Sequence, residues 1–489
     1  PKDKRFADPA WQSSGIHRRL AQAHAATARE LERYIATSPL EARDKARAQL
    51  AAAILIDTVA PSNTLLNPSA LKRAIDTGGA SWLKGAKNLI HDLRHNHGLP
   101  SSVDKSKFEL GRNLCLTPGN VVFRNEVLEL IQYQPQTDTV FSRPLIVCPP
   151  QVNKFYAMDL SPEKSLFKYV TEQGLQLFAV SWRNPRLQHR HWDMSTYVGA
   201  LDEAVEAARQ ITGSPDVNLW GACSGGMTLA AYVGWLAATG QQHKVASIVS
   251  PVCVLDPQHA LDTTMGLMIT EQSIKAIKAA VKRKGFVDGA ELARMFAWLR
   301  PNDLIWNYWV NNYLMGNDPP AFDILYWNAD TTRLPAAFHA QLLDIMHDSP
   351  YAKAGGMTVL GEPIDMSKVD VDAYIVAGIT DHITPWKACY QTARIYGSQS
   401  TFTLANAGHL QSILNPPATA KSFFFTQDAS AADADRWAAG AERKEGSWWP
   451  HCMAWMQQRS GPRVARPKKL GSRKHKPGVA APGQYILEP

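Results

Sequence analysis

The stretch that decides the fold is VNLWGACSGGMTLAAYVGWLAATG, residues 217–240. A short apolar strand runs into a glycine-rich turn, and an apolar segment long enough for a helix follows. Gly221 and Gly225 stand on either side of Cys223, where a tight strand-to-helix turn leaves no room for side chains. Such a turn holds Cys223 exposed, in strained backbone geometry, at a helix N-terminus whose dipole favours thiolate. We predict that Cys223 is a nucleophile; the alternative is a small buried cysteine in a glycine-rich turn.

Short apolar runs alternate with helical segments on both sides of this stretch. They are PLIVCPP (144–150), LQLFAVSW (175–182), KVASIVSPV (244–252), VDAYIVAGIT (371–380) and TFTLANAGH (401–409). This alternation predicts an α/β fold with a mainly parallel sheet and crossover helices. Between about 251 and 366 a stretch rich in Trp, Tyr, Asn and Pro interrupts the pattern. We interpret it as an insertion that forms a cap, since insertions between such strands lie near the ligand-binding edge of the sheet.

Composition and charge set the remaining domain limits. Of the 489 residues 45% are apolar and 20% charged, as in ordinary globular proteins. Residues 1–118 show helical patterns, so we predict a helical N-terminal domain (1–118), a catalytic domain (119–456) and a basic tail (457–489). Residues 459–476 hold eight Lys and Arg and no acid; removing eight from 52 basic residues leaves 44, equal to the 44 acidic ones. We predict a solvated tail and no nucleic-acid partner; an anionic ligand or surface is the alternative.

Two further polar residues follow predicted strands. Asp381 comes directly after VDAYIVAGIT, and His409 ends TFTLANAGH. The order Cys, Asp, His matches the catalytic triad of α/β hydrolases, in which the acid follows a late strand and the histidine the last one. We predict a triad of Cys223, Asp381 and His409; a loop carboxylate and a satisfied polar histidine are the alternatives. His382 could replace His409, but adjacent residues in extended backbone point to opposite sides.

The same fold predicts an oxyanion hole made of backbone N–H groups. One comes from the residue after the nucleophile, here Ser224, and one from the loop after an early strand. In that loop Pro149 and Pro150 have no N–H to give, so we predict Val152 as the second donor.

The sequence gives no sign of a metal site, a disulfide framework or a membrane span. The six cysteines form no CxxC pair, and His91, His95 and His97 lack a carboxylate in a known metal motif, so we predict no bound metal. The apolar run from Leu50 to Ile56 is far shorter than the about twenty residues of a spanning helix. The opening PKDKRFADPAWQ lacks the apolar core of a secretory signal, so we expect a cytoplasmic protein.

Motifs along almost the whole chain resemble those of the polyhydroxyalkanoate synthases, which polymerise (R)-3-hydroxyacyl-CoA thioesters into storage polyester. The motifs are FADPAW (6–11), PPQVNKFYAMDLSPEKSL (149–166), VSWRNP (180–185), GACSGG (221–226), RPNDLIWNYWVNNYL (300–314), PPAFDILYWNADTTRLP (319–335), DHITPW (381–386), GHLQSILNPP (408–417) and GSWWPHC (446–452). GACSGG and the ending LGSRKHKPGVAAPGQYILEP resemble the medium-chain (class II) branch, whereas PHCMAW departs from the PHW-type sequence of that region.

The resemblance implies an acyltransferase of the α/β-hydrolase fold with nucleophile, acid and base at Cys223, Asp381 and His409. It implies a homodimer that associates with polyester granules and granule-associated proteins, and a CoA thioester as substrate with no separate cofactor. A thiolate suits this chemistry because it exchanges readily with a thioester. A cysteine-nucleophile thioesterase or esterase and a non-enzymatic granule-coat protein are the alternatives, and either Asp381 or His409 could activate the incoming hydroxyl.

Two expectations concern the monomer and the N-terminal domain. The resemblance to the medium-chain branch implies a preference for acyl groups of about six to fourteen carbons, and burial of the longer tail would contribute about 0.8 kcal/mol for each methylene. The small residues Ala222 and Ser224 leave room beside Cys223, while the aromatic cap residues either cover the alkyl tail or pack the cap itself; they are Trp306, Tyr308, Trp309 and Tyr313. We expect residues 1–118 to serve granule attachment, partner contacts and dimer stability.

Overall fold

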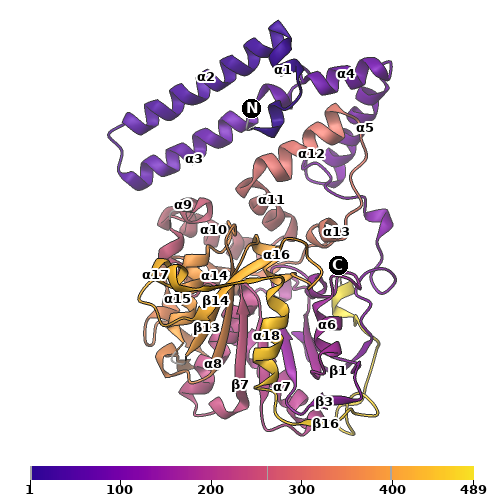
Figure 1. Cartoon of the computed structure of the whole chain (residues 1–489), viewed down its shortest axis with the longest axis vertical. Coiled ribbons are helices and arrows are strands. Elements are labelled where there is room, and N and C mark those ends of the chain that lie inside the picture. Colours follow the sequence, from indigo (N-terminus) through magenta and orange to yellow (C-terminus); the bar gives the residue numbers. More distant parts are fainter. Residues whose placement is uncertain (1–2, 262, 397–398, 489) are drawn as a thin grey trace. The chain divides into compact units, whose positions relative to one another are not determined.

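The computed structural model describes residues 3–261, 263–396 and 399–488, and the chain divides into two compact units (Figure 1). The first unit comprises Pro1–Lys107 and Ala290–Ala329, and the second comprises Phe108–Gly289 and Asp330–Pro489. Part of the insertion predicted at about 251–366 thus groups with the N-terminal helices, and the rest belongs to the second unit. Within the described ranges, no helix has both the length and the apolar character that crossing a membrane requires.

The first unit is built from helices. Its N-terminal part contains α1 (Ala10–Ser13), α2 (Gly15–Thr37), α3 (Ala42–Thr58), α4 (Pro68–Asp76) and α5 (Ala80–His95). Its inserted part, residues 290–329, contains most of α11 (Gly289–Leu299), then α12 (Asn307–Trp309) between the π-helical turns η8 (Asn302–Trp306) and η9 (Val310–Leu314), and finally α13 (Asp323–Ala329). The start of α4 shows why the chain turns helical there. Asn67 caps the N–H groups of Ser69 and Ala70, and Pro68 supplies a preset backbone angle at the first helical position.

The inserted segment packs closely on the N-terminal helices inside this unit. The Tyr313 hydroxyl donates to the buried carboxylate of Asp92 at 2.7 Å, and the Trp309 indole donates to the carbonyl of Asn63 at 3.0 Å. A Cβ placed on Gly85 would lie 1.9 Å from the Tyr313 carbonyl oxygen, so α5 and η9 meet backbone to backbone. The ring of Trp309 also contacts the rings of Trp306 and Tyr313. These aromatic side chains therefore have a packing role within the first unit.

A ten-stranded mixed sheet forms the centre of the second unit. Its strands are β1 (Gly119–Arg124), β2 (Leu128–Tyr133), β4 (Leu145–Cys148), β5 (Leu177–Trp182), β6 (Val217–Gly221), β7 (Val245–Pro251), β12 (Asp372–Gly378), β13 (Ser400–Ala405), β14 (Phe423–Asp428) and β15 (Glu442–Glu445), in the order β1-β2-β5-β4-β6-β7-β12-β13-β14-β15. The six strands from β5 to β13 in that order run parallel, and antiparallel pairs stand at both edges. The predicted α/β class and mainly parallel sheet are confirmed.

Helices lie between and after the strands and cover the sheet (Figure 1). They are α6 (Leu166–Glu172), α7 (Met194–Thr212), α8 (Ser224–Ala238), α15 (Trp386–Ile395), α16 (His409–Ile413), α17 (Ala434–Gly440) and α18 (Trp448–Gln457). Between β7 and β12 lie further helices of this unit, α9 (Thr264–Met268), α10 (Glu271–Lys284) and α14 (Ala336–Asp348). The same part of the chain contains two short antiparallel pairs, β8 (Phe286–Val287) with β9 (Leu334–Pro335) and β10 (Thr358–Val359) with β11 (Glu362–Pro363). Every residue of β4 and β6 is buried, as expected for strands covered on both faces. Their carboxyl ends share one edge, since Cys148 pairs with Gly221.

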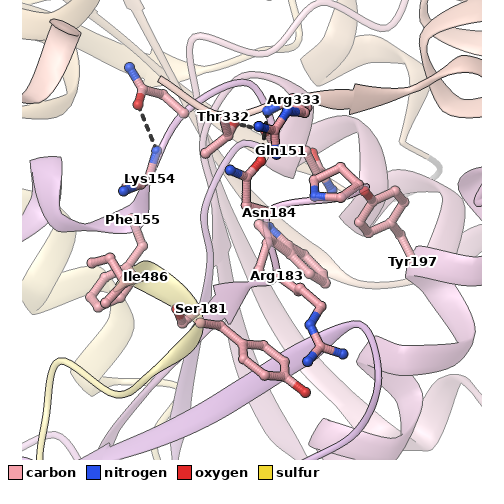
Figure 2. A pocket seen from close by; sticks show the side chains of 14 residues that line it. Gln151, Lys154, Phe155, Ser181, Arg183, Asn184, Tyr197, Thr332, Arg333 and Ile486 are labelled. Atoms are coloured by element: carbon pink, nitrogen blue, oxygen red, sulfur yellow. Dashed lines mark hydrogen bonds between the residues drawn. The ribbon is translucent and has the colours of Figure 1, made fainter. Parts of the chain in front are cut away.

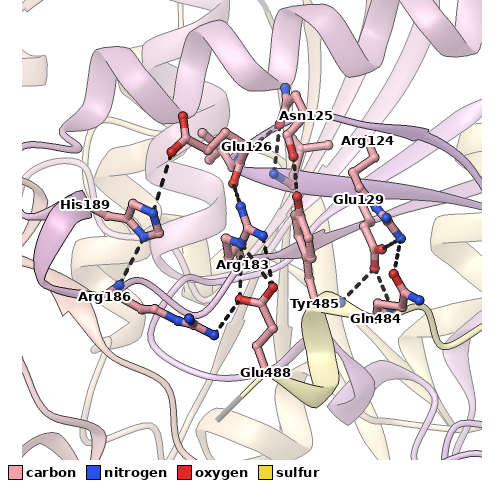
Figure 3. A network of polar contacts seen from close by, with 12 residues as sticks. Arg124, Asn125, Glu126, Glu129, Arg183, Arg186, His189, Gln484, Tyr485 and Glu488 are labelled. Carbon is pink, nitrogen blue, oxygen red and sulfur yellow. Dashed lines mark hydrogen bonds and ion pairs between the residues drawn. The ribbon is translucent and has the colours of Figure 1, made fainter.

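The C-terminal tail follows the edge of the sheet. Its strand β16 (Arg463–Ala465) pairs with β3 (Thr139–Phe141), and further on Gly478 and Ala481 donate backbone hydrogen bonds to β1. The last turn, η12 (Tyr485–Leu487), docks on the sheet through the network in Figure 3. Glu129, fully buried on β2, accepts the backbone N–H groups of Gln484 and Tyr485 at 2.8 and 3.0 Å. The tail thereby covers an edge that would otherwise expose unpaired backbone groups.

Candidate active site

Cys223 lies in the turn between β6 and α8, with φ 50° and ψ −124°. Its N–H donates to the carbonyl of Pro251, at the end of the neighbouring strand β7, at 3.0 Å. Positive φ is costly for a residue with a Cβ, so the surrounding packing must hold the turn in place. The side chain stays partly exposed, whereas the other five cysteines are buried.

Three glycines make this turn possible. A Cβ on Gly225 would lie 2.3 Å from the carbonyl oxygen of Cys148 at the end of β4. A Cβ on Gly221 would meet the side chain of Leu229 at 2.6 Å, and one on Gly226 would meet the Ser250 hydroxyl at 2.6 Å. The elbow is therefore pressed against the adjacent strand and its own helix, as the glycine spacing in the sequence predicts.

Asp381 and His409 lie together after the ends of β12 and β13. His409, the first residue of α16, places its Nδ1 at 2.7 Å from Oδ2 of Asp381. The backbone N–H groups of Ile383 and Thr384 donate to the other carboxylate oxygen at 2.8 and 2.9 Å. The Thr384 hydroxyl donates to Oδ2 at 2.6 Å. This carboxylate is therefore fixed from four directions, and its side chain is fully buried.

The Cys223 side chain interacts with His409, and this interaction contributes to raising the pKa of the imidazole. Since Asp381 occupies Nδ1, the ring nitrogen that remains for Cys223 is Nε2. The structure thus brings the three residues predicted from sequence into one chain of contacts. Thr384 belongs to the same cluster, although sequence reasoning gave it no role; its place in Asp381-His-Ile-Thr384, an Asx-type turn, was the available signal.

The charge state of this cluster follows from its contacts. Burial lowers the pKa of His409, but the charge and hydrogen bond of Asp381 outweigh burial and raise that pKa well above its ordinary value. Burial raises the pKa of Asp381. The charge and hydrogen bond of His409, together with the hydroxyl and backbone hydrogen bonds of Thr384, outweigh burial and lower that pKa. The arrangement therefore favours a charged imidazolium held by an ionised carboxylate.

The loop after β4 is tied to the elbow. The N–H of Gln151 donates to the Ser224 hydroxyl at 3.2 Å, and its side-chain amide donates to Thr228 Oγ1, one turn along α8, at 2.9 Å. Val152 follows directly. Across the described part of the chain, no hydrogen-bond acceptor is found for the backbone N–H of Val152 or Ser224. Two unused N–H donors therefore stand on the two segments that Gln151 joins.

Two models of known families match the chain. Residues 2–170 match the N-terminal region of the poly-beta-hydroxybutyrate polymerases, and residues 144–416 match the α/β-hydrolase fold. Two poly(3-hydroxyalkanoate) polymerases of Ectopseudomonas oleovorans, numbers 2 and 1, are 49% and 48% identical to this chain. They cover 100% and 99% of it and 87% and 86% of their own length. The polymerase subunit of Cupriavidus necator is 37% identical over 99% of this chain and 83% of its own.

The chain belongs to the poly(3-hydroxyalkanoate) polymerase family. It is accordingly an enzyme of the acyltransferase type, and its second unit has the predicted α/β-hydrolase fold. In this polymerase the remaining cysteines differ from Cys223 in their surroundings. Burial raises the pKa of each of the other five thiols far above the ordinary value; they are Cys115, Cys148, Cys253, Cys389 and Cys452. They are therefore poor nucleophiles at neutral pH.

Other residues considered in the sequence fall outside this cluster. His91 and His95 stack on one another on α5 in the first unit, with ring centroids 4.6 Å apart. Among the described residues, no group of three or more His, Cys, Asp or Glu side chains is arranged to hold a metal ion. Ala222 is fully buried and Ser224 nearly so, and the Ser224 hydroxyl accepts the hydrogen bond from Gln151.

Proposed function

We propose that this polymerase joins (R)-3-hydroxyacyl-CoA monomers into a polyester, with release of CoA, through an acyl intermediate on Cys223. The thiolate of Cys223 attacks the thioester carbonyl, the bond to the CoA sulfur breaks, and the leaving thiolate takes a proton from the His409 imidazolium. The 3-hydroxyl of a further monomer or of the growing chain then gives its proton to His409 and attacks the acyl group. An ester bond forms, and the Cys223 thiolate leaves.

The contacts of Asp381 favour His409 as the base in the second step. Asp381 accepts four hydrogen bonds, its side chain is fully buried, and its pKa is lowered despite the burial, so its carboxylate is a weak and inaccessible base. His409 contacts Asp381 through Nδ1, which leaves Nε2 as the nitrogen that can take the proton. Asp381 then orients the imidazole and stabilises its charge.

The backbone N–H groups of Val152 and Ser224 are proposed to stabilise the oxyanion of each tetrahedral intermediate. Both are unused in the described structure, and they stand on the loop and the elbow that Gln151 ties together. Removing one donor of this kind costs about 10² to 10³ in kcat in other acyl-transfer enzymes.

The observation that carries the proposal is the contact chain from Asp381 through His409 to Cys223 at the strained elbow, in a chain of this family. The test uses purified protein and (R)-3-hydroxydecanoyl-CoA, with CoA release and insoluble polymer measured together. We expect one CoA per polymerised unit. Release of CoA with free 3-hydroxy acid as the only other product would instead show a thioesterase.

The Cys223→Ala variant completes this test. It should lose turnover and keep its melting temperature, since a methyl side chain fits at the same elbow. Polymer synthesis above about one per cent of the unsubstituted rate would refute Cys223 as the nucleophile. The proposal needs no cofactor, because the thioester itself supplies an activated acyl group.

We also propose medium-chain monomers. The support is the resemblance of GACSGG and of the C-terminal ending to the medium-chain branch. Each extra buried methylene contributes about 0.8 kcal/mol, so three would favour the longer monomer by more than about tenfold. The test is a competition between 3-hydroxybutyryl-CoA and 3-hydroxydecanoyl-CoA, read as polymer composition. A product dominated by four-carbon units would refute the medium-chain assignment alone.

The family further suggests a homodimer at the surface of cytoplasmic polyester granules. Exposed apolar side chains on the N-terminal helices support a role in such contacts; examples are Ile16, Tyr34, Ile75, Leu83 and Leu93, each more than half exposed. Deletion of residues 1–107 in the living cell should then disperse the protein and reduce dimer formation. Full dimerisation and full granule localisation of the deleted form would refute this role.

A further inference from the structure

The loop that carries Val152 lies against another part of the second unit. Residues 330–333, called here the return segment, lead the chain back from the inserted segment 290–329. They run antiparallel to residues 151–154, and Asn153 and Thr331 form a β-bridge. Figure 2 shows Thr332 and Arg333 beside Gln151, with Lys154 on the same loop.

The contacts between the two segments proceed residue by residue. The Thr332 hydroxyl donates to the carbonyl oxygen of Gln151 at 3.0 Å. Lys154 Nζ lies 2.7 Å from the carboxylate of Asp330. The Tyr156 hydroxyl, on a fully buried side chain, donates to the other oxygen of Asp330 at 2.9 Å. Val152 therefore stands between Gln151 and Asn153, and the return segment holds both neighbours.

The return segment is itself held. The N–H of Arg333 donates to the side chain of Asn184 at 2.9 Å, next to β5. A Cβ on Gly289 would lie 2.3 Å from Thr331 Oγ1, so the point where the chain leaves the second unit touches the point where it returns. The cavity that the loop and the return segment line together with residues 181–185, Tyr197, Tyr485 and Ile486 measures about 10 Å³, room for about one water molecule, so it is too small for an acyl group.

We propose that Thr332 and Asp330 are positioning residues that fix the loop 151–154 and thereby aim the Val152 N–H at the oxyanion. This inference rests on the proposed function, in which Val152 is an oxyanion donor. The carbonyl of Gln151 and the N–H of Val152 belong to the same planar peptide unit. A hydrogen bond that holds the carbonyl therefore also fixes the direction of the N–H. The Thr332 hydrogen bond therefore acts on the peptide unit that supplies the donor.

The test compares Thr332→Val, which removes the hydroxyl and keeps the shape, with Thr332→Ser, which keeps the hydroxyl. Thr332→Val should lower kcat for CoA release from (R)-3-hydroxydecanoyl-CoA by about tenfold, less than complete loss of an oxyanion donor, with KM little changed. Thr332→Ser should restore kcat to within about twofold, since the same hydrogen bond re-forms. Asp330→Asn, which weakens the Lys154 contact, should lower kcat in the same way.

Alkylation of Cys223 by iodoacetamide separates positioning from general damage. This alkylation requires the Cys223 thiolate but does not use the oxyanion hole. The alkylation rate should therefore stay within about twofold of the unsubstituted rate in Thr332→Val, Thr332→Ser and Asp330→Asn. The inference is overturned if Thr332→Val and Asp330→Asn keep the unsubstituted kcat, or if their kcat and alkylation rate fall together. Failure of the proposed function would appear differently, as polymer synthesis by Cys223→Ala.

Discussion

Replacing Gly225 by Ala tests the elbow most directly. The added Cβ would lie 2.3 Å from the Cys148 carbonyl oxygen, where real Cβ atoms keep at least about 3.0 Å, so the elbow or the end of β4 must move by 3.0 − 2.3 = 0.7 Å or more. The atom in the way is backbone in a fully buried strand, which has little freedom to yield. Cys223 is two residues away and moves with the turn.

A displacement of this size affects both activity and stability. Misplacing reacting groups by about 1 Å can cost on the order of 10² in rate, and overpacking a core costs about 1–3 kcal/mol. We therefore expect CoA release by Gly225→Ala to fall at least tenfold, with a melting temperature lower by a few degrees. Gly221→Ala should be milder, because the two atoms that its Cβ would meet below 3.0 Å belong to the side chain of Leu229, and the nearest backbone atom, the carbonyl carbon of Gly225, lies at 3.0 Å.

The matched control is Gly199→Ala on α7 of the same unit. A Cβ there meets only a Leu360 methyl at 3.6 Å, an ordinary contact. Ala inside a helix is favoured over Gly by about 0.5–1 kcal/mol, so this variant should melt at the same or a higher temperature and keep its activity. If Gly225→Ala behaved like Gly199→Ala in both measurements, the steric account of the elbow would be wrong.

Three further outcomes are expected. Short treatment of the native protein with iodoacetamide should label Cys223 alone, as peptide mass spectrometry would show, since the other five thiols are buried; labelling of a second cysteine at a similar rate would contradict this. The Asp381→Asn variant should be less stable, and its melting-temperature deficit should be largest between the ordinary pKa values of about 3.8 and 6.5. It should shrink as the pH falls through the lowered pKa of Asp381 or rises through the raised pKa of His409, whereas a deficit that is constant from pH 3 to pH 11 would refute the ion pair. Removing residues 484–489 should lower the melting temperature more than Glu129→Gln does, because truncation leaves a buried carboxylate without two N–H donors; equal or smaller effects would argue against the tail as a structural strap.

The sequence alone determined the elements whose cause is local. Two glycines around Cys223 between an apolar strand and an apolar helix specify a tight turn, because only residues without side chains fit there. Asp381 and His409 could be singled out because each follows a buried strand, and parallel strands end at one edge of the sheet. The motifs of the family cover nearly the whole chain and led to the same residues.

Tertiary structure decided what depends on contacts between distant residues. The patterns in the chain do not show that Tyr313 packs on Asp92, so the grouping of segment 290–329 with the N-terminal helices emerged only from the folded chain. The basic tail gave no sign that its end would cap Glu129, 355 residues away in sequence. The pairing of Thr332 with Gln151 is likewise separated by 181 residues. Side-chain periodicity reports which face of an element is buried, but not which partner covers it, and that choice is made by packing and hydrogen-bond satisfaction across the whole fold.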